Sequence, residues 1–110
     1  MNYAQIELNL KLMTYKVEEI NNISVVHLNG EIDMDVADKA RQTILPLIES
    51  GKSVQVNLSK VDYMDSSGIS VLIESHQKAL EKNTKVIIKD VSKSVLKVIM
   101  MAKLEQILNL

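Results

Sequence analysis

Residues 54–80 read VQVNLSKVDYMDSSGISVLIESHQKAL and contain both of the hydrophobic periods from which α/β folds are built. Every second residue from Val54 to Leu58 is apolar, which is typical of a strand with one buried face. From Ile69 to Leu80 the apolar residues recur every three or four positions, which is typical of a helix packed on a sheet. Residues 61–68, between the two, are rich in aspartate and serine and form the predicted loop.

A hairpin is predicted upstream of this unit. Apolar residues alternate on both sides of Asn21-Asn22, so we expect two antiparallel strands within residues 14–29, joined by a turn at this asparagine pair. Asn29-Gly30 is the expected end of the second strand.

An amphipathic helix is expected to follow from about Asp35, because the apolar residues of this segment share one helical face. Asp33 or Asp35 can cap its N-terminus through the side chain. Pro46 is expected to kink or interrupt the helix, since proline has no N–H to donate. Gly51 can supply the left-handed residue that ends many helices.

Downstream of the loop-containing unit, residues 86–88 form a short apolar strand and residues 91–104 have the spacing of a last helix. Strands that alternate with helices in this way need crossover connections. The chain is therefore predicted to form a single α/β domain, a mixed and largely parallel β-sheet covered by helices. Residues 1–12 precede this pattern as an N-terminal extension or an extra edge strand. Because an exposed edge strand can pair with a second chain, the sequence is compatible with a monomer and with a dimer.

The composition excludes several classes of protein. The 110 residues include 13 basic and 14 acidic side chains, a net charge of -1, and no Cys, Phe or Trp. Such a chain offers neither a positive surface nor aromatic platforms for nucleic acid, and no thiol for disulfides or catalysis. It also has no apolar run long enough to cross a membrane and no signal-peptide layout, so we expect a cytoplasmic protein.

Two loops are expected to meet at the carboxyl edge of the sheet, where α/β proteins commonly bind ligands and partners. The first contains Asp33. The second contains Asp65, Ser66 and Ser67, followed by Gly68, which allows a tight turn into the helix. Both serines fall at the cap or in the first turn, where free N–H groups and the helix dipole favour a phosphate. The position suits one serine as a plain N-cap equally well.

These two loops also resemble a known family. The run Gly30-Glu31-Ile32-Asp33 and the run VDYMDSSGI at residues 61–69 are similar to those of the STAS domains of bacterial anti-sigma factor antagonists. The resemblance covers residues 13–110. It implies a regulator without catalytic residues, cofactor or metal ion. The dephosphorylated form would bind an anti-sigma factor that is also a serine kinase, and a serine phosphatase would reverse the phosphorylation.

The resemblance assigns roles to individual residues. It implies that Ser66 is the phosphorylation site, with Ser67 as the alternative. We also expect Met64 to be exposed beside the motif. The partner-binding residues implied by the resemblance, together with this methionine, are Asp33, Met64, Asp65, Ser66, Ser67 and Gly68.

Two other functions are compatible with the sequence. A STAS protein can act as a scaffold or a partner switch in another pathway, such as secretion, biofilm control or lipid transport. Alternatively, carboxylates near the two loops could hold Mg²⁺, as in a receiver domain that accepts a phosphoryl group. The candidate ligands for that ion are Asp33, Asp35, Asp62 and Asp65. A receiver also needs an acidic pair after its first strand and a lysine after a fifth strand, and the predicted strands do not supply them.

Methionines and histidines have less specific predictions. Met100 and Met101 lie on the last predicted helix, and we expect them to fill gaps in a core that is poor in aromatic residues. The alternative is an adaptable contact surface, which these two residues would form with Met34 and Met64. His27 falls in a strand and His76 on a helix. Each is expected to be a packed or half-exposed side chain and not a catalyst.

Overall fold

The computed structural model describes residues 15–110, so the predicted N-terminal extension, residues 1–12, lies outside the described part of the chain. The elements follow one another in the predicted order, which confirms the α/β class. They are β1 (Lys16–Ile20), β2 (Ile23–Ile32), α2 (Ala37–Glu49), β3 (Ser53–Met64), α3 (Ser66–Glu81), β4 (Val86–Lys89) and α4 (Lys93–Met101).

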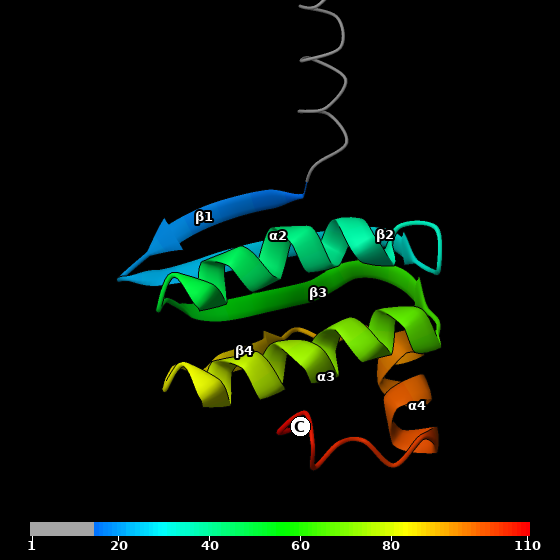
Figure 1. Cartoon of the computed structure of the whole chain (residues 1–110). Helices are drawn as coiled ribbons and strands as arrows, with labels where there is room; N and C mark the ends of the chain where they lie inside the picture. Colours follow the sequence, from blue (N-terminus) through cyan, green and yellow to red (C-terminus); the bar gives the residue numbers. More distant parts are fainter. Residues whose placement is uncertain (1–14) are drawn as a thin grey trace, which may run out of the picture.

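Within residues 15–110 the strands form one four-stranded sheet in the order β1-β2-β3-β4 (Figure 1). β1 is antiparallel to β2, whereas β2 and β3, and β3 and β4, are parallel. The turn between β1 and β2 consists of Asn21 and Asn22, with φ of 51° and 66°, a left-handed conformation that asparagine tolerates and tight hairpins require. The predicted hairpin and the mixed, largely parallel sheet are confirmed.

Strands β2 and β3 extend further than the sequence predicts. The expected ends are Asn29-Gly30 and Leu58, but the strands end at Ile32 and Met64. The pairing of β2 with β3 contains two register shifts, each of which inserts one extra residue into β3. The buried residues Leu58, Val61 and Met64 therefore lie three positions apart instead of two. That spacing no longer resembles a strand, which explains the early predicted end of β3.

The start of helix α2 also differs from the prediction. No side chain caps the helix, which begins at Ala37 directly after Val36. Instead, the backbone carbonyl of Asp33 accepts hydrogen bonds from the N–H groups of Val36 (3.2 Å) and Ala37 (2.9 Å). The predicted cap by the side chain of Asp33 or Asp35 is wrong.

At the end of α2, one part of the Pro46 prediction is wrong and the Gly51 prediction is confirmed. Pro46 does not interrupt the helix, which continues to Glu49 although proline has no N–H to donate to the preceding turn. Beyond the helix, Gly51 has φ of +88° and its N–H donates to the Ile48 carbonyl (2.9 Å), while the Lys52 N–H donates to the Leu47 carbonyl (3.2 Å). This pair of bonds is a Schellman motif, so the predicted role of Gly51 is confirmed.

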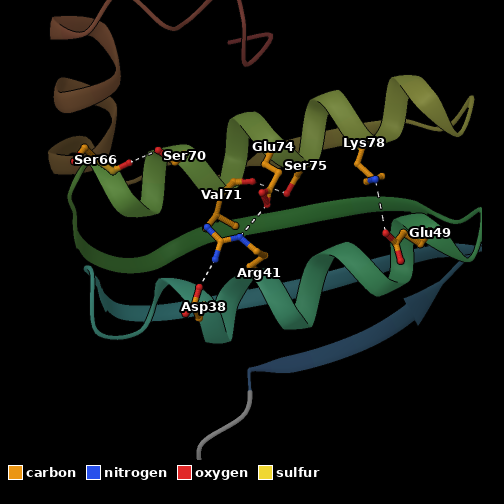
Figure 2. Close-up of polar contacts among 9 residues, drawn as sticks. All are labelled: Asp38, Arg41, Glu49, Ser66, Ser70, Val71, Glu74, Ser75 and Lys78. Carbon is orange, nitrogen blue, oxygen red and sulfur yellow. Dashed lines mark hydrogen bonds and ion pairs between the residues drawn. The ribbon is translucent and has the colours of Figure 1, made fainter.

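Helices α2 and α3 lie side by side over one face of the sheet and run in the same direction (Figures 1 and 2). Two ion pairs join them: Arg41 Nε lies 2.9 Å from Glu74 Oε1, and Lys78 Nζ lies 3.7 Å from Glu49 Oε1 (Figure 2). Both helices begin at the same edge of the sheet. The largest fully buried side chains of the core are Leu28, Ile32, Ile44, Ile48, Leu58, Met64, Leu72, Ile99, Leu108, Val26, Val54 and Val56.

Three side chains expected to face the core are exposed. Leu80, at the end of α3, is 79% exposed, and Met100 and Met101 of α4 are 56% and 75% exposed. The buried face of α4 is defined by Val95 and Ile99, four residues apart, and the two methionines point away from that face. The prediction that they fill the core is wrong.

Candidate functional site

The site lies where β2 and β3 end side by side. Ile32 pairs with Met64, and the N–H of Asp65 donates to the Ile32 carbonyl (3.3 Å). Asp33 and Asp65 each directly follow one of these paired residues, so the two predicted loops leave the sheet from neighbouring points. Helices α2 and α3 begin just beyond, at the same edge (Figure 1).

Asp65 is the N-cap of α3. Its Oδ1 accepts hydrogen bonds from the N–H groups of Ser67 (2.8 Å) and Gly68 (3.3 Å). Ser66 and Ser67 therefore occupy the first turn. The N-cap is Asp65, whereas the sequence was also compatible with a serine at this position. Ser66 is exposed, and its backbone carbonyl accepts a hydrogen bond from the Ser70 hydroxyl (2.8 Å; Figure 2).

Gly68 and Met64 support this turn from inside. A Cβ at Gly68 would lie 2.5 Å from Met64 Cγ and 2.7 Å from the Ile32 carbonyl oxygen. The backbone at Gly68 is not left-handed, so glycine is required by the close approach of α3 to the strand ends and not by the turn itself. Met64 is 1% exposed, so the expectation of an exposed Met64 is wrong.

The loop before α2 is built around Asp33. Its Oδ1 accepts a hydrogen bond from the Asp35 N–H (3.0 Å). The buried Tyr15 is close by: burial raises the pKa of its hydroxyl, and the negative charge of Asp33 raises that pKa further. Lys39 Nζ lies 4.9 Å from the centre of the Tyr15 ring, within cation–π range. The sequence analysis missed both Tyr15 and Lys39, because no local pattern links them to this loop.

Helix α4 is hydrogen-bonded to the segment that leads to Ser66. Ser92 Oγ donates to the Val61 carbonyl (2.7 Å), and Ser94 Oγ donates to the Asp62 carbonyl (3.0 Å). Both carbonyls belong to the part of β3 with extra residues, where bulges leave backbone groups without a partner in the sheet. Figures 1 and 2 show α4 beside the start of α3. From sequence alone, Ser92 is recognisable only as an N-cap candidate for α4.

Comparison with known proteins identifies the family. A family model of the STAS domain matches residues 14–110. The chain belongs to the STAS domain family. The anti-sigma-B factor antagonist of Bacillus subtilis (strain 168) is 26% identical over 94 residues, which is 86% of each chain. That of Staphylococcus epidermidis is 30% identical over 79 residues, 71% of this chain and 69% of the relative.

The fold of this STAS domain is also found among solved structures. The anti-sigma factor antagonist SpoIIAA, in its unphosphorylated form, has a TM-score of 0.73 at 23% identity, with 84% of each chain covered. The similarity covers most of both chains. It supports the sheet topology and helix arrangement described above.

Metal binding and membrane insertion are two other possibilities for the STAS domain. Over residues 15–110, no three His, Asp or Glu side chains lie together in a way that could hold a metal ion. The four aspartates of the receiver-type alternative therefore do not form such a group. No helix in the same range is both long and apolar enough to cross a membrane.

Both histidines have a polar neighbour in the structure. His27 Nε2 lies 3.4 Å from Glu18 Oε1 on the neighbouring strand, and His76 Nδ1 lies 3.0 Å from the Leu72 carbonyl within α3.

Proposed function

We propose that this STAS protein is an anti-sigma factor antagonist, a non-catalytic regulator in the cytoplasm controlled by phosphorylation of Ser66, with Ser67 as the alternative site. The dephosphorylated protein binds an anti-sigma factor that is also a serine kinase. Phosphorylation releases that partner, and a serine phosphatase restores binding. The relatives support the regulatory role, because both are anti-sigma-B factor antagonists and one of them aligns over 86% of each chain.

The cap made by Asp65 is the observation that carries the proposal. Because Asp65 Oδ1 binds the N–H groups of Ser67 and Gly68, the cap does not require the hydroxyl of Ser66. Ser66 is exposed at the first position of α3, where a kinase can reach it. The positive end of the helix dipole stabilises a phosphate there by about 0.3–1 kcal/mol, so phosphorylation does not need to unfold the helix.

The phosphate would strongly change the electrostatics of this edge. It adds about -1.5 to -2 charge close to the carboxylates of Asp33 and Asp65. At a distance of ~6 Å and an effective dielectric constant of ~20, each pair of unit charges repels by about 3 kcal/mol before salt screening. This repulsion exceeds the stabilisation from the helix dipole, so the edge becomes strongly anionic.

A partner that packs against the neutral serine would have to desolvate this charge. A loss of ~3–5 kcal/mol in binding free energy weakens the complex by about 10²-fold to more than 10³-fold. In this proposal Asp33, Asp65, Ser66 and Ser67 contact the partner. The buried Gly68 and Met64 act indirectly, by holding α3 against the strand ends.

The phosphorylation site is tested with the anti-sigma factor kinase of the same organism and ATP. Mass spectrometry is expected to find one phosphate on the wild type and on Ser67→Ala, and none on Ser66→Ala. Ser70→Ala, one turn further along α3, is the matched control and should be phosphorylated like the wild type. Phosphate on any residue other than Ser66 contradicts the assignment.

Binding of the same kinase is measured separately by pull-down. Ser66→Ala should retain the kinase in the presence of ATP, whereas the phosphorylated wild type and Ser66→Asp should release it. Circular dichroism checks that Ser66→Asp remains folded. If the phosphorylated wild type binds as tightly as the unmodified protein, phosphorylation does not control the complex and the switch proposal fails.

A further inference from the structure

A hollow of about 450 Å³ lies on the face of the sheet that points away from α2 and α3. Val26 of β2 and Val56 of β3 are fully buried in the core beneath these helices, so the next residues, His27 and Asn57, point to the opposite face. Figure 1 shows α2 and α3 on the near side of the sheet. The polar residues that line the hollow are Lys16, His27, Asn29, Asn57, Ser59 and Lys60. A ligand bound there does not depend on the proposed function of Ser66.

A bulge in β3 shapes this hollow. Between the pairs His27–Asn57 and Asn29–Lys60, β3 has one residue more than β2. Such a bulge bends the strand and changes the direction of its side chains. Ser59 and Lys60 are consecutive and would point to opposite faces of a regular strand, yet both line the hollow. The extra residue therefore gathers polar side chains at one place on the sheet.

The lining side chains offer hydrogen-bond donors, and no carboxylate is among them. Asn57 Oδ1 accepts from the Ser59 N–H (2.8 Å), so the part of this amide that remains for a ligand is the donor Nδ2. Ser59 and Lys60 are exposed, which makes a hydroxyl and an ammonium group accessible beside it. Amide, hydroxyl and ammonium donors together are suited to the oxygens of an anion.

Positive charge lies on both sides of the hollow. Lys16 is on β1 and Lys60 is on β3, two strands away, which is about 10 Å at a strand spacing of about 4.8 Å. Lys89 of β4 belongs to the same cross-strand row as Lys16. Glu18 takes up part of this charge, because its Oε1 lies 2.9 Å from Lys16 Nζ and 3.4 Å from His27 Nε2. Within residues 15–110, neither Lys60 nor Lys89 forms an ion pair, so the region stays positive.

These features favour a ligand with an anionic group at each end. Cavities of roughly 300–1,000 Å³ are typical of small-molecule sites, and a compact anion such as phosphate would reach the lysine on one side only. An apolar or a cationic molecule would not pair with the donors. We propose that this hollow binds a short-chain dicarboxylate, with one carboxylate at Lys16, the other at Lys60, and Asn57 Nδ2 donating to the ligand between them.

The probe for the test is succinate, titrated into the full chain at constant ionic strength and followed by ¹⁵N–¹H NMR. Saturable shifts are expected for residues 27–29 and 57–60. Acetate has one carboxylate and inorganic phosphate is compact, so each should bind at least about tenfold more weakly than succinate.

Variants test the donor and the charge separately. Asn57→Asp keeps the oxygen that accepts from the Ser59 N–H but replaces the donor amide with a like charge, and it should weaken succinate binding at least about tenfold. Lys60→Gln removes the charge at one end, so succinate should bind about fivefold more weakly and come closer to acetate. Lys97→Gln makes the same change at an exposed lysine of α4 and is the matched control, with wild-type affinity expected.

Several results would overturn the assignment. They are the absence of saturable shifts with the wild type, shifts confined to other residues, an affinity for acetate or phosphate equal to that for succinate, and an unchanged affinity in Asn57→Asp that circular dichroism shows to be folded. Should Asn57→Asp fail to fold, the comparison of Lys60→Gln with Lys97→Gln decides, and equal affinities of these two variants refute the proposal.

Discussion

Replacing Gly68 with alanine tests the close contact between α3 and the strand ends. The added Cβ would lie 2.7 Å from the Ile32 carbonyl oxygen and 2.5 Å from Met64 Cγ, both well inside normal contact distances. Overpacking of this kind costs about 1–3 kcal/mol. The better helix propensity of alanine offsets roughly 0.5–1 kcal/mol of that cost. We expect a net loss of ~1–2 kcal/mol, because a backbone carbonyl held in the sheet cannot move aside as a side chain can.

Urea unfolding followed by far-UV circular dichroism measures this loss as a lower midpoint at an unchanged m-value. In thermal unfolding, each 1 kcal/mol corresponds to a Tm decrease of roughly 4–8 °C for a domain of about this size. Ser70→Ala is the control on the same helix, where the side chain is exposed, and it should change stability by no more than about 0.5 kcal/mol.

The same substitution should also affect the site. Gly68 lies in the same helical turn as Ser66, so displacement of this turn is expected to slow the proposed phosphorylation of Ser66. If Gly68→Ala unfolds at the wild-type urea concentration or above it, α3 does not depend on this close approach and the reasoning is refuted.

Three further predictions concern stability. Ser92→Ala leaves the Val61 carbonyl of β3 without its hydroxyl donor and should cost about 1 kcal/mol in urea unfolding; an unchanged midpoint would show that water replaces the hydroxyl. Pro46→Ala restores a backbone N–H on the exposed side of α2, so the Tm should rise. A lower Tm would contradict the view that this proline only removes a hydrogen bond. The raised pKa of Tyr15 means that the folded state keeps the phenolic proton more tightly than the unfolded state. Its contribution to stability is therefore complete below about pH 10 and is lost as the pH rises through the folded pKa. Urea unfolding from about pH 9 to 11 should show a flatter profile for Tyr15→Phe than for the wild type, and equal slopes would contradict the assignment.

The order of the strands and helices was predictable, because the spacing of apolar residues along a segment shows whether it is a strand or a helix with one face against the core. The same reasoning failed at the ends of β2 and β3. In β3 the bulges change the spacing of buried residues from two to three, and the three-residue spacing from Leu58 to Met64 has no strand-like appearance. In β2 the spacing stays even up to Ile32, and the Asn29-Gly30 pair inside the strand resembles a turn. A bulge is set by pairing with another strand, so it leaves little trace in the local sequence.

The edge that carries Asp33, Asp65 and Ser66 was partly predictable for a similar reason. The DSSG run at residues 65–68 has the composition of a helix start, and the structure places it there. Which of its residues caps the helix was not predictable, because aspartate and serine are equally good N-caps. The exposure predicted for Met64 was wrong, because its side chain follows the altered alternation of β3 into the core.

On its own, the sequence determined the α/β class, the largely parallel sheet and the edge from which Asp33 and Ser66 emerge, since these follow from the order and period of local segments. Only the tertiary structure decided that Gly68 is required by contact with Ile32 and that the Ser92 hydroxyl binds a strand carbonyl. Both depend on distances between segments far apart in the chain, and a period along the chain carries no information about such distances.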